Sequence, residues 1–297
     1  MSYLSELNRR YYNDTADQWR ESVRGTKDDH KDKISRLVNE SRYRAARALL
    51  PKDGRRRYLD FGCGCGDFSL ALLRDGNAVL GLDPSENMIA MAKAEARDAG
   101  FDPVVFCEGD AKRWPKGECF DAILALAVLF FLSPEDEALF FKQSRAALND
   151  DGFVLCSYIN KFADLVTLNE YSLRILRGQV LPKLTHEKAE TERLTEALQE
   201  LLPGAGGDKS FKNVGIVSVT DIRPENPFHL DRKFAEHGFE IDDMVFSRFY
   251  LLPPEIIERE ENFALFQKQI ELIEHREESE LGPIFAKTMT LRLKPIG

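Results

Sequence analysis

A strand-like run that ends in an acid, followed by three glycines at alternate positions, constrains the fold of this chain more than any other feature. The run is Tyr58-Leu59-Asp60-Phe61, and Gly62-Cys63-Gly64-Cys65-Gly66 and a helix-like stretch at 68–74 come after it. Glycine at such a turn lets backbone N–H groups approach a ligand closely, and the N-terminus of the following helix favours polar ligands at the same place. The sequence therefore predicts a binding site of the nucleotide-cofactor type at the end of this strand.

The glycine spacing separates this turn from two other phosphate-binding turns. The dinucleotide fingerprint requires G-x-G-x-x-G, whereas Gly62, Gly64 and Gly66 give G-x-G-x-G, and Asp67 stands where the third glycine would fall. A phosphate loop is excluded because no Gly-Lys-Ser/Thr follows the turn. The variant present here points away from nicotinamide and flavin cofactors.

Strand-like and helix-like segments alternate around this turn, from a break at 51–54 to residue 160. Apolar runs predict strands at 58–61, 78–82, 104–108, 121–126 and 153–159. Helices are expected between them at 68–74, 87–99 and 135–148, with a turn at 149–152. Near-continuous apolar strands separated by helices favour a parallel sheet that is covered on both faces.

The pattern differs on either side of this region. Two helices are expected before it, at 3–19 and 31–50. After it, the sequence predicts helices at 161–177 and 187–202, a flexible stretch at 203–207, a strand-like run at 214–220 and a loop at 221–228. The sheet pattern then resumes with a helix at 230–237, a strand at 239–252, a long charged helix at 254–276 and a last strand at 285–293.

Two further acids are expected at the same edge of the sheet as the glycine turn. Asp83 closes the second strand, and Asp110 follows the third. An acid in the position of Asp83 can accept both ribose hydroxyls of a bound nucleoside in an open α/β sheet. Three acids and a glycine turn at one edge therefore predict a nucleoside-binding site.

At these positions the chain resembles the class I S-adenosylmethionine-dependent methyltransferases. Residues 60–66 match the first motif of that family, D-x-G-x-G-x-G, and Asp83 with the turn after it matches the ribose-binding acid. Glu108-Gly109-Asp110-Ala111 matches the adenine-side motif. The resemblance covers roughly residues 49–160 well and 227–295 loosely, and it is specific for cofactor and fold rather than for substrate.

The resemblance implies a Rossmann-like α/β fold. We expect a seven-stranded, mostly parallel sheet with helices on both faces and an antiparallel last strand, plus N-terminal helices and a helical lid insert. The corresponding division is an N-terminal helical cap at 1–50, a cofactor-binding core at 51–160, a lid or substrate insert at 161–226 and the C-terminal part of the core sheet at 227–297.

The resemblance also implies roles for particular residues around S-adenosylmethionine and its product S-adenosylhomocysteine. Asp60 orients the ammonium, Asp83 holds the ribose and Asp110 accepts from the adenine amine. A tyrosine or arginine near the N-terminus closes over the methionine carboxylate, for which Tyr11, Tyr12 and Arg20 are candidates. The full expected set of cofactor-binding residues is Tyr12, Arg20, Asp60, Gly62, Cys63, Gly64, Gly66, Asp83, Pro84, Met88, Asp110, Ala111 and Leu126.

No metal site is expected at the turn. Cys63 and Cys65 form a C-x-C pair, but without a second pair it lacks the four ligands of a structural zinc site.

The end of the fourth expected strand bears on the methyl acceptor. The end of the fourth expected strand, 124–131, carries no acid, amide or histidine, and the Asn/Asp-Pro-Pro-aromatic signature of amide and base N-methyltransferases is absent there. A similar Asn226-Pro227-Phe228 lies outside that strand. We therefore expect a small-molecule acceptor that is methylated at oxygen, with the insert as a lid.

A general base, where the acceptor needs one, is expected from the insert or the segment after it. His229 is the first candidate, and His186, Asp221, Glu225 and His237 are weaker ones. A structural role for His229 at the start of a helix is the alternative.

Composition limits the remaining alternatives. A net charge of −9 over 297 residues argues against general binding of nucleic acid, which depends on neutralising phosphates. The chain shows no apolar run of membrane-spanning length and no apolar signal core at its N-terminus, so a cytoplasmic enzyme is expected. An RNA or protein methyltransferase, which would use basic residues such as Arg55–Arg57, and a non-catalytic cofactor-binding scaffold or sensor stay open, as does the oligomeric state.

Overall fold

The structure is a computed structural model. It describes residues 3–24, 29–52, 54–166, 172–173, 176–184, 188–201, 222–251 and 258–297. The expected flexible stretch at 203–207, the expected strand at 214–220 and the candidate bases His186 and Asp221 lie outside these residues.

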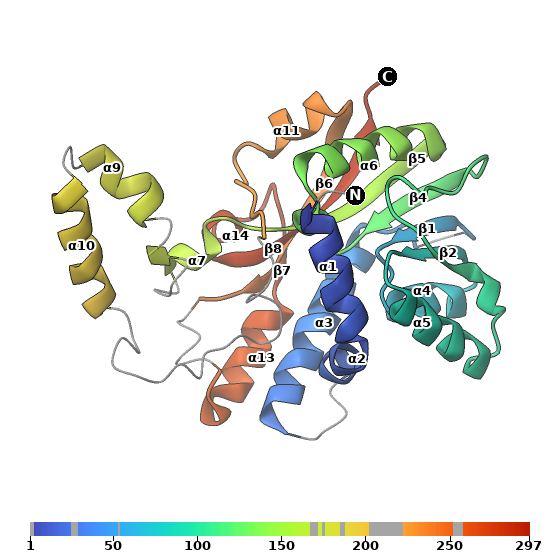
Figure 1. Ribbon diagram of the computed structural model, residues 1–297, viewed down its shortest axis with the longest axis horizontal. Helices are drawn as coiled ribbons and strands as arrows, with labels where there is room; N and C mark the ends of the chain where they lie inside the picture. The colour runs from blue at the N-terminus through green and yellow to red at the C-terminus, as the bar shows by residue number, and fades with distance from the viewer. Residues whose placement is uncertain are drawn as a thin grey trace.

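A single central sheet organises the described part of the chain (Figure 1). Its strand order is β3-β2-β1-β4-β5-β8-β6-β7. The strands are β1 (Arg57–Phe61), β2 (Ala78–Asp83), β3 (Phe106–Glu108), β4 (Phe120–Ala125), β5 (Leu148–Ile159), β6 (Phe239–Phe249), β7 (Ile273–His275) and β8 (Ala286–Pro295). The first five are parallel to one another, and β8 runs antiparallel between β5 and β6. The predicted Rossmann-like sheet with an antiparallel last strand is therefore confirmed.

The predicted number of seven strands is wrong, because the described part of the chain forms eight. The additional strand is β7, which pairs antiparallel with β6 at the outer edge of the sheet. It lies inside the long helix expected at 254–276. Among its described residues, 258–276, helical structure is found in the 3₁₀ turn η4 (Glu260–Asn262) and in α13 (Phe263–Glu271), and the backbone becomes extended at Leu272. Ile273 then packs against the same apolar cluster as Val245 of β6, so pairing with the open edge overrides the local helical pattern.

Helices cover the two faces of the sheet, as the apolar strands predicted. One face packs against α6 (Pro134–Ala147) and α11 (Leu230–Glu236), which contribute Phe140, Phe141 and Phe234 to the largest apolar cluster. The other face packs against α3 (His30–Leu49) and α4 (Asp67–Arg74) through Leu49 and Phe68, with α5 (Glu86–Asp98) beside β2 and β3.

Several element boundaries differ from the sequence-based expectations. The helix expected at 3–19 is two helices, α1 (Tyr3–Asp14) and α2 (Ala16–Arg24). A short 3₁₀ helix, η1 (Pro103–Val105), occupies the start of the expected third strand. The turn expected at 149–152 lies within β5, whose pairing with β4 shifts register between Phe120 and Ala122.

The segment after β5 leaves the sheet and forms short helices. They are α7 (Ala163–Val166), the π-helical turn η3 (Leu176–Val180), α9 (Leu181–Leu184) and α10 (Lys188–Leu201). Helices α9 and α10 lie at the left of Figure 1, well separated from α4 and α5 at the right. No helix in the described part of the chain combines the length and apolar character needed to cross a membrane.

Candidate cofactor site

The glycine turn between β1 and α4 is held by backbone hydrogen bonds to the neighbouring strand. The N–H groups of Gly62 and Cys63 donate to the carbonyl of Leu82 at 2.6 and 3.1 Å. Gly62 has a φ of 75°, and a side chain on it would lie 2.3 Å from Cγ2 of Val128. Gly64 has a φ of 54° and open space where a side chain would stand. The turn therefore requires glycine at both positions and leaves the backbone at Gly64 accessible to a ligand.

Asp83 is the acid at the end of β2, and it faces the glycine turn. Its Oδ2 accepts from the N–H of Gly64 at 3.0 Å, and its Oδ1 accepts from the N–H of Ser85 at 2.9 Å. Burial raises the pKa of Asp83 to about 6, although the two backbone N–H groups favour the carboxylate. The half-buried carboxylate is therefore fixed in position at the sheet edge by the turn.

Asp60, at the end of β1, is also a buried acid of this edge. Its Oδ2 accepts from the hydroxyl of Ser69 at 2.5 Å. Burial raises the pKa of Asp60 to about 6, and the nearby charge of Asp83 contributes in the same direction. A buried and a half-buried carboxylate close to each other create a negative potential that favours a cationic group.

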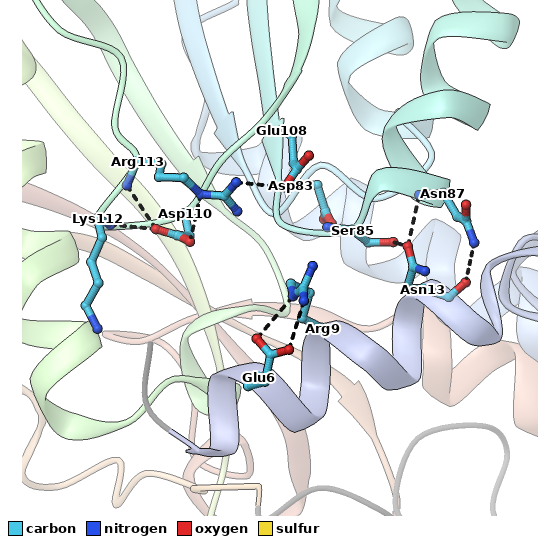
Figure 2. Close-up of polar contacts among 10 residues, drawn as sticks. All are labelled: Glu6, Arg9, Asn13, Asp83, Ser85, Asn87, Glu108, Asp110, Lys112 and Arg113. Atoms are coloured by element: carbon cyan, nitrogen blue, oxygen red, sulfur yellow. Dashed lines mark hydrogen bonds and ion pairs between the residues drawn. The ribbon is translucent and has the colours of Figure 1, made fainter.

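Asp110 organises the turn after β3, which forms the far end of the same edge (Figure 2). Its Oδ1 accepts from the N–H groups of Lys112 and Arg113 at 2.8 and 2.9 Å. The Arg113 guanidinium donates to Asp110 Oδ2 at 3.3 Å and to Glu108 Oε1 at 2.7 Å. Asp110 thus has a defined orientation before any ligand binds.

One cavity unites most of the predicted cofactor-binding residues. The members that line it are Tyr12, Asp60, Gly62, Cys63, Gly64, Asp83, Pro84, Met88, Asp110, Ala111 and Leu126. These residues come from α1, from the start of α5 and from the ends of β1, β2, β3 and β4. Residues separated by more than a hundred positions are therefore brought to one edge of the parallel sheet.

Three predicted site residues do not line this cavity. Gly66 faces the core, where an added side chain would lie 2.9 Å from the Phe106 ring. Arg20 forms an ion pair with Glu95 at 3.7 Å on α5. His229 is exposed at the start of α11, with Nδ1 3.3 Å from the amide nitrogen of Asn226. His229 therefore lies outside the cavity lining, and its role as a base stays a prediction.

The cavity also contains a cation that the sequence analysis did not assign to the cofactor. Arg42 lines it from α3, next to Asn39, whose Oδ1 accepts from the guanidinium at 3.3 Å. Burial lowers the pKa of Arg42, the nearby charge of Arg248 acts in the same direction, and the resulting pKa is about 10. In the described part of the chain Arg42 makes no ion pair with an acid. The helical spacing of 39 and 42 was the only sequence signal, since residues three apart share a helix face.

Helix α1 covers the cavity and is attached to both of its sides. The Tyr12 ring makes edge-on contacts with Trp19 and Phe131, at centroid distances of 5.5 and 5.8 Å. Asn13 accepts from the N–H of Asn87 at 3.1 Å and from the hydroxyl of Ser85 at 3.2 Å. Figure 2 shows Asn13 reaching the start of α5, with Arg9 and its partner Glu6 further along α1.

The wall after β4 contains an unusual backbone conformation. Ala127 has a φ of 59°, which costs about 1–2 kcal/mol for a residue with a side chain. Its N–H donates to the Ser157 hydroxyl on β5 at 2.8 Å, and this bond holds the turn in place. The turn aims Leu126, Val128 and Phe131 at the cavity. Such strain is concentrated at functional sites.

These features fit S-adenosylmethionine. The open backbone at Gly64 accommodates the methionine part, Arg42 is available for a carboxylate, the buried acids favour an ammonium, and Asp83 is placed for ribose hydroxyls. No group of three metal-ligating side chains is found among the described residues. Fold and site together define an α/β protein that binds a nucleoside-containing cofactor at the carboxyl ends of its strands.

Comparison with known proteins identifies the family. A family model described as a methyltransferase domain matches residues 59–152. The ubiquinone biosynthesis O-methyltransferase of Agrobacterium fabrum is 30% identical over 59% of this chain and 68% of its own length. The same enzyme from Azorhizobium caulinodans is 34% identical over 58% of this chain. The chain belongs to the class I S-adenosylmethionine-dependent methyltransferases.

Solved structures agree on the fold. An S-adenosylmethionine-dependent methyltransferase from Thermotoga maritima superposes with a TM-score of 0.56 at 17% identity, covering 96% of this chain and 98% of its own. The magnesium protoporphyrin IX methyltransferase of Synechocystis, solved with S-adenosylhomocysteine, gives 0.54 at 18% identity, covering 97% and 98%. This chain spans 66% of the length of the Azorhizobium relative and 50% of the length of the Bradyrhizobium diazoefficiens one. These shares are smaller than those of the solved structures.

Proposed function

We propose that the protein transfers the methyl group of S-adenosylmethionine to an oxygen of a small-molecule acceptor. The observation that carries the proposal is the single cavity in which Asp60, Gly64, Asp83 and Arg42 meet an apolar wall. The bound cofactor supplies an electrophilic methyl group on a sulfonium. The ubiquinone biosynthesis O-methyltransferases support oxygen as the acceptor atom.

The residues of the chain have distinct roles in this proposal. Gly62, Cys63 and Gly64 cradle the methionine part, while Arg42, in place of Arg20, pairs with its carboxylate. Asp83 with Pro84 holds the ribose. Met88, Asp110 and Ala111 surround the adenine, and Leu126 lies beside the sulfonium. Positioning of the acceptor oxygen about 3–3.5 Å from the methyl carbon then supplies much of the rate.

The acceptor hydroxyl is proposed to be acidic, such as a phenol. No histidine lines the cavity among the described residues, and each of its carboxylates has a partner. Asp67 pairs with Arg24 at 2.7 Å and Asp136 with Lys112 at 3.0 Å. Asp60, Asp83 and Asp110 accept the hydrogen bonds given above. A hydroxyl that ionises on its own needs no histidine, so His229 is left out of the mechanism.

We propose the same division of the chain that the sequence predicts. In this division the insert at 161–226 is the part that contacts the acceptor. The described residues that line the cavity all come from outside the insert, and the N-terminal helices form its cover. We propose that the insert meets the acceptor beyond this cavity.

Incubation of the purified protein with methyl-labelled S-adenosylmethionine and a panel of phenols and catechols tests the proposal. We expect label in a small organic product, and the same turnover from the variant His229→Ala. Label in RNA or protein would support an RNA or protein methyltransferase instead. Tight binding of S-adenosylhomocysteine without transfer to any acceptor would support a scaffold or sensor.

A further inference from the structure

The two ends of the insert are joined at a neck beside β5. The N–H of Glu225 donates to the carbonyl of Ile159 at 2.8 Å, and the N–H of Lys161 donates to the carbonyl of Glu225 at 2.9 Å. Asn160, which forms a parallel bridge with Glu225, is fully buried and donates to the carbonyls of Pro283 and Ala286 at 3.0 and 2.8 Å. The neck is therefore a fixed part of the core.

Arg223, two residues before this neck contact, reaches the wall of the cofactor cavity. Its N–H donates to the carbonyl of Phe130 at 3.0 Å, and its guanidinium donates to the carbonyl of Leu129 at 3.4 Å. Both carbonyls belong to η2 (Leu129–Phe131), the 3₁₀ turn after β4. Phe131 and the following Leu132 line the cavity, so Arg223 holds the back of the wall whose front faces the ligand.

A buried acid anchors the Arg223 side chain. Glu137 of α6 is 3% exposed, and its Oε2 accepts from Arg223 Nη2 at 3.0 Å. Its Oε1 accepts from the Tyr158 hydroxyl at 2.5 Å and from Lys233 Nζ at 2.8 Å. Lys233 also binds Glu225 at 2.6 Å. Two acids and two cations thus balance within the core and connect β5, α6, α11 and the neck.

The charges of this network keep Glu137 ionised. Burial raises the pKa of Glu137, but the charge and hydrogen bond of Lys233, together with Tyr158 and Arg223, outweigh it and leave the pKa below its ordinary value. A buried anion that is fully hydrogen-bonded gives its partners a single preferred arrangement. The Arg223 guanidinium is accordingly held in one position against η2.

We propose that Arg223 is a positioning residue that couples the neck of the insert to the Leu129–Leu132 wall of the cavity. The placement of Phe131, and through it the Tyr12–Trp19 ring contacts, then depends on the Arg223 side chain. The expected effect on acceptor binding rests on the proposed function, whereas the expected effect on the position of the wall does not.

Three variants separate this role from a general effect on stability. Arg223→Met removes both the ion pair and the contact with Leu129. Arg223→Lys keeps a cation for Glu137. Lys233→Met is the matched control, because it also removes a cation from buried Glu137 but touches no residue of the wall.

The first measurement reports on the position of the wall and needs no acceptor. In a Trp114→Phe background, Trp19 is the only tryptophan of the chain, and its fluorescence quenching by acrylamide is measured with S-adenosylhomocysteine bound. We expect quenching to increase in Arg223→Met, to return toward wild type in Arg223→Lys and to stay unchanged in Lys233→Met. Equal changes in Arg223→Met and Lys233→Met, or none in either, would overturn the coupling.

The second readout uses an acceptor found by the labelled-methyl experiment. We expect the KM of the acceptor to rise about tenfold in Arg223→Met with a smaller change in kcat, and to stay near wild type in Lys233→Met. Failure to find any acceptor would contradict the proposed function, whereas the quenching result would still decide whether Arg223 positions the wall.

Discussion

Asp60 is buried and Asp83 is half-buried, and loss of water is the main cause of their pKa values of about 6. Such groups are ready to interact with a ligand, because hydroxyls or an ammonium can replace the hydration that burial removed. Structural carboxylates of the same protein behave differently. Arg292 and Lys294, which outweigh the effect of burial, lower the pKa of Asp242 below its ordinary value.

The raised pKa of Asp83 predicts a pH dependence of cofactor binding. As the pH falls through about 6, the carboxyl takes up a proton and loses acceptor capacity for the ribose hydroxyls, so affinity is present above this pKa and is lost below it. We expect the Kd for S-adenosylhomocysteine, measured by calorimetry, to be constant above pH 7 and to rise about tenfold by pH 5.

The variant Asp83→Asn serves as the control for this prediction. It should bind about 10- to 100-fold more weakly at pH 7.5 and show no further loss between pH 7 and pH 5. A full pH dependence that persists in Asp83→Asn would assign the titration to Asp60 instead.

Arg42 gives a second prediction at the level of one residue. A half-buried cation whose hydrogen-bond partner is an amide should bind a ligand carboxylate strongly. We expect Arg42→Met to weaken binding of S-adenosylhomocysteine by about 10- to 100-fold in the same calorimetric measurement. Arg20→Met is the matched control, because Arg20 pairs with Glu95 outside the cavity, and it should bind within about twofold of wild type. A larger loss of affinity in Arg20→Met than in Arg42→Met would restore the sequence-based assignment of Arg20.

At the level of elements, α1 is a cover that polar contacts attach to the cofactor-binding part of the chain. Asn13 joins it to the start of α5, next to Asp83, through two hydrogen bonds to its Oδ1. Its backbone carbonyl accepts from the Asn87 amide at 2.8 Å. Arg24 of α2 adds ion pairs to Asp67 and Glu95, both at 2.7 Å. The cover is therefore attached to the same elements that hold the cofactor.

Loss of the Asn13 side chain should loosen this cover. We expect Asn13→Ala to bind S-adenosylhomocysteine about five- to a hundredfold more weakly, because two net hydrogen bonds of about 0.5–1.5 kcal/mol each are lost. Limited proteolysis should cut the N-terminal helices faster in this variant. The exposed amide Gln18 on α2 provides the control Gln18→Ala, which should match wild type in both measurements. Identical behaviour of the two variants would show that Asn13 does not hold α1.

At the scale of the whole molecule, the site joins elements that are distant in the chain, so ligand binding should stabilise the fold as a unit. The cavity takes residues from α1, α3 and the ends of four strands. A ligand at 100 times its Kd adds about 2.7 kcal/mol to the free energy of unfolding. This corresponds to a rise in Tm of roughly 5–10 °C for a domain of this size.

A thermal melt at pH 7.5 with and without S-adenosylhomocysteine checks this expectation. The shift should be smaller at pH 5 at the same ligand concentration, because Asp83 is then mostly protonated. In Asp83→Asn the shift should be small at both pH values. An equal shift in wild type and Asp83→Asn would mean that the ligand binds elsewhere.

The successes and failures of the sequence-based predictions have a common physical basis. Gly62, Gly64 and Asp83 were expected at one sheet edge, where the structure has them, because a strand, a turn and a helix start are encoded by neighbouring residues; their contact with the cofactor stays a prediction. Arg42 was not assigned to the cofactor because α3 is brought over the sheet only by packing of Leu49 against the core. Strand β7 was missed because its pairing is decided by the open edge of β6 rather than by its own pattern.

By itself, the sequence determined the α/β class, the parallel core, the glycine turn and the acids at the sheet edge, since each follows from local periodicity and from the rule that parallel strands end together. Only the tertiary structure decided that Arg42 rather than Arg20 or His229 lies in the cavity, that an eighth strand completes the sheet, and that Arg223 meets the cavity wall. Those outcomes depend on contacts between segments far apart in the chain, whose geometry no local pattern encodes.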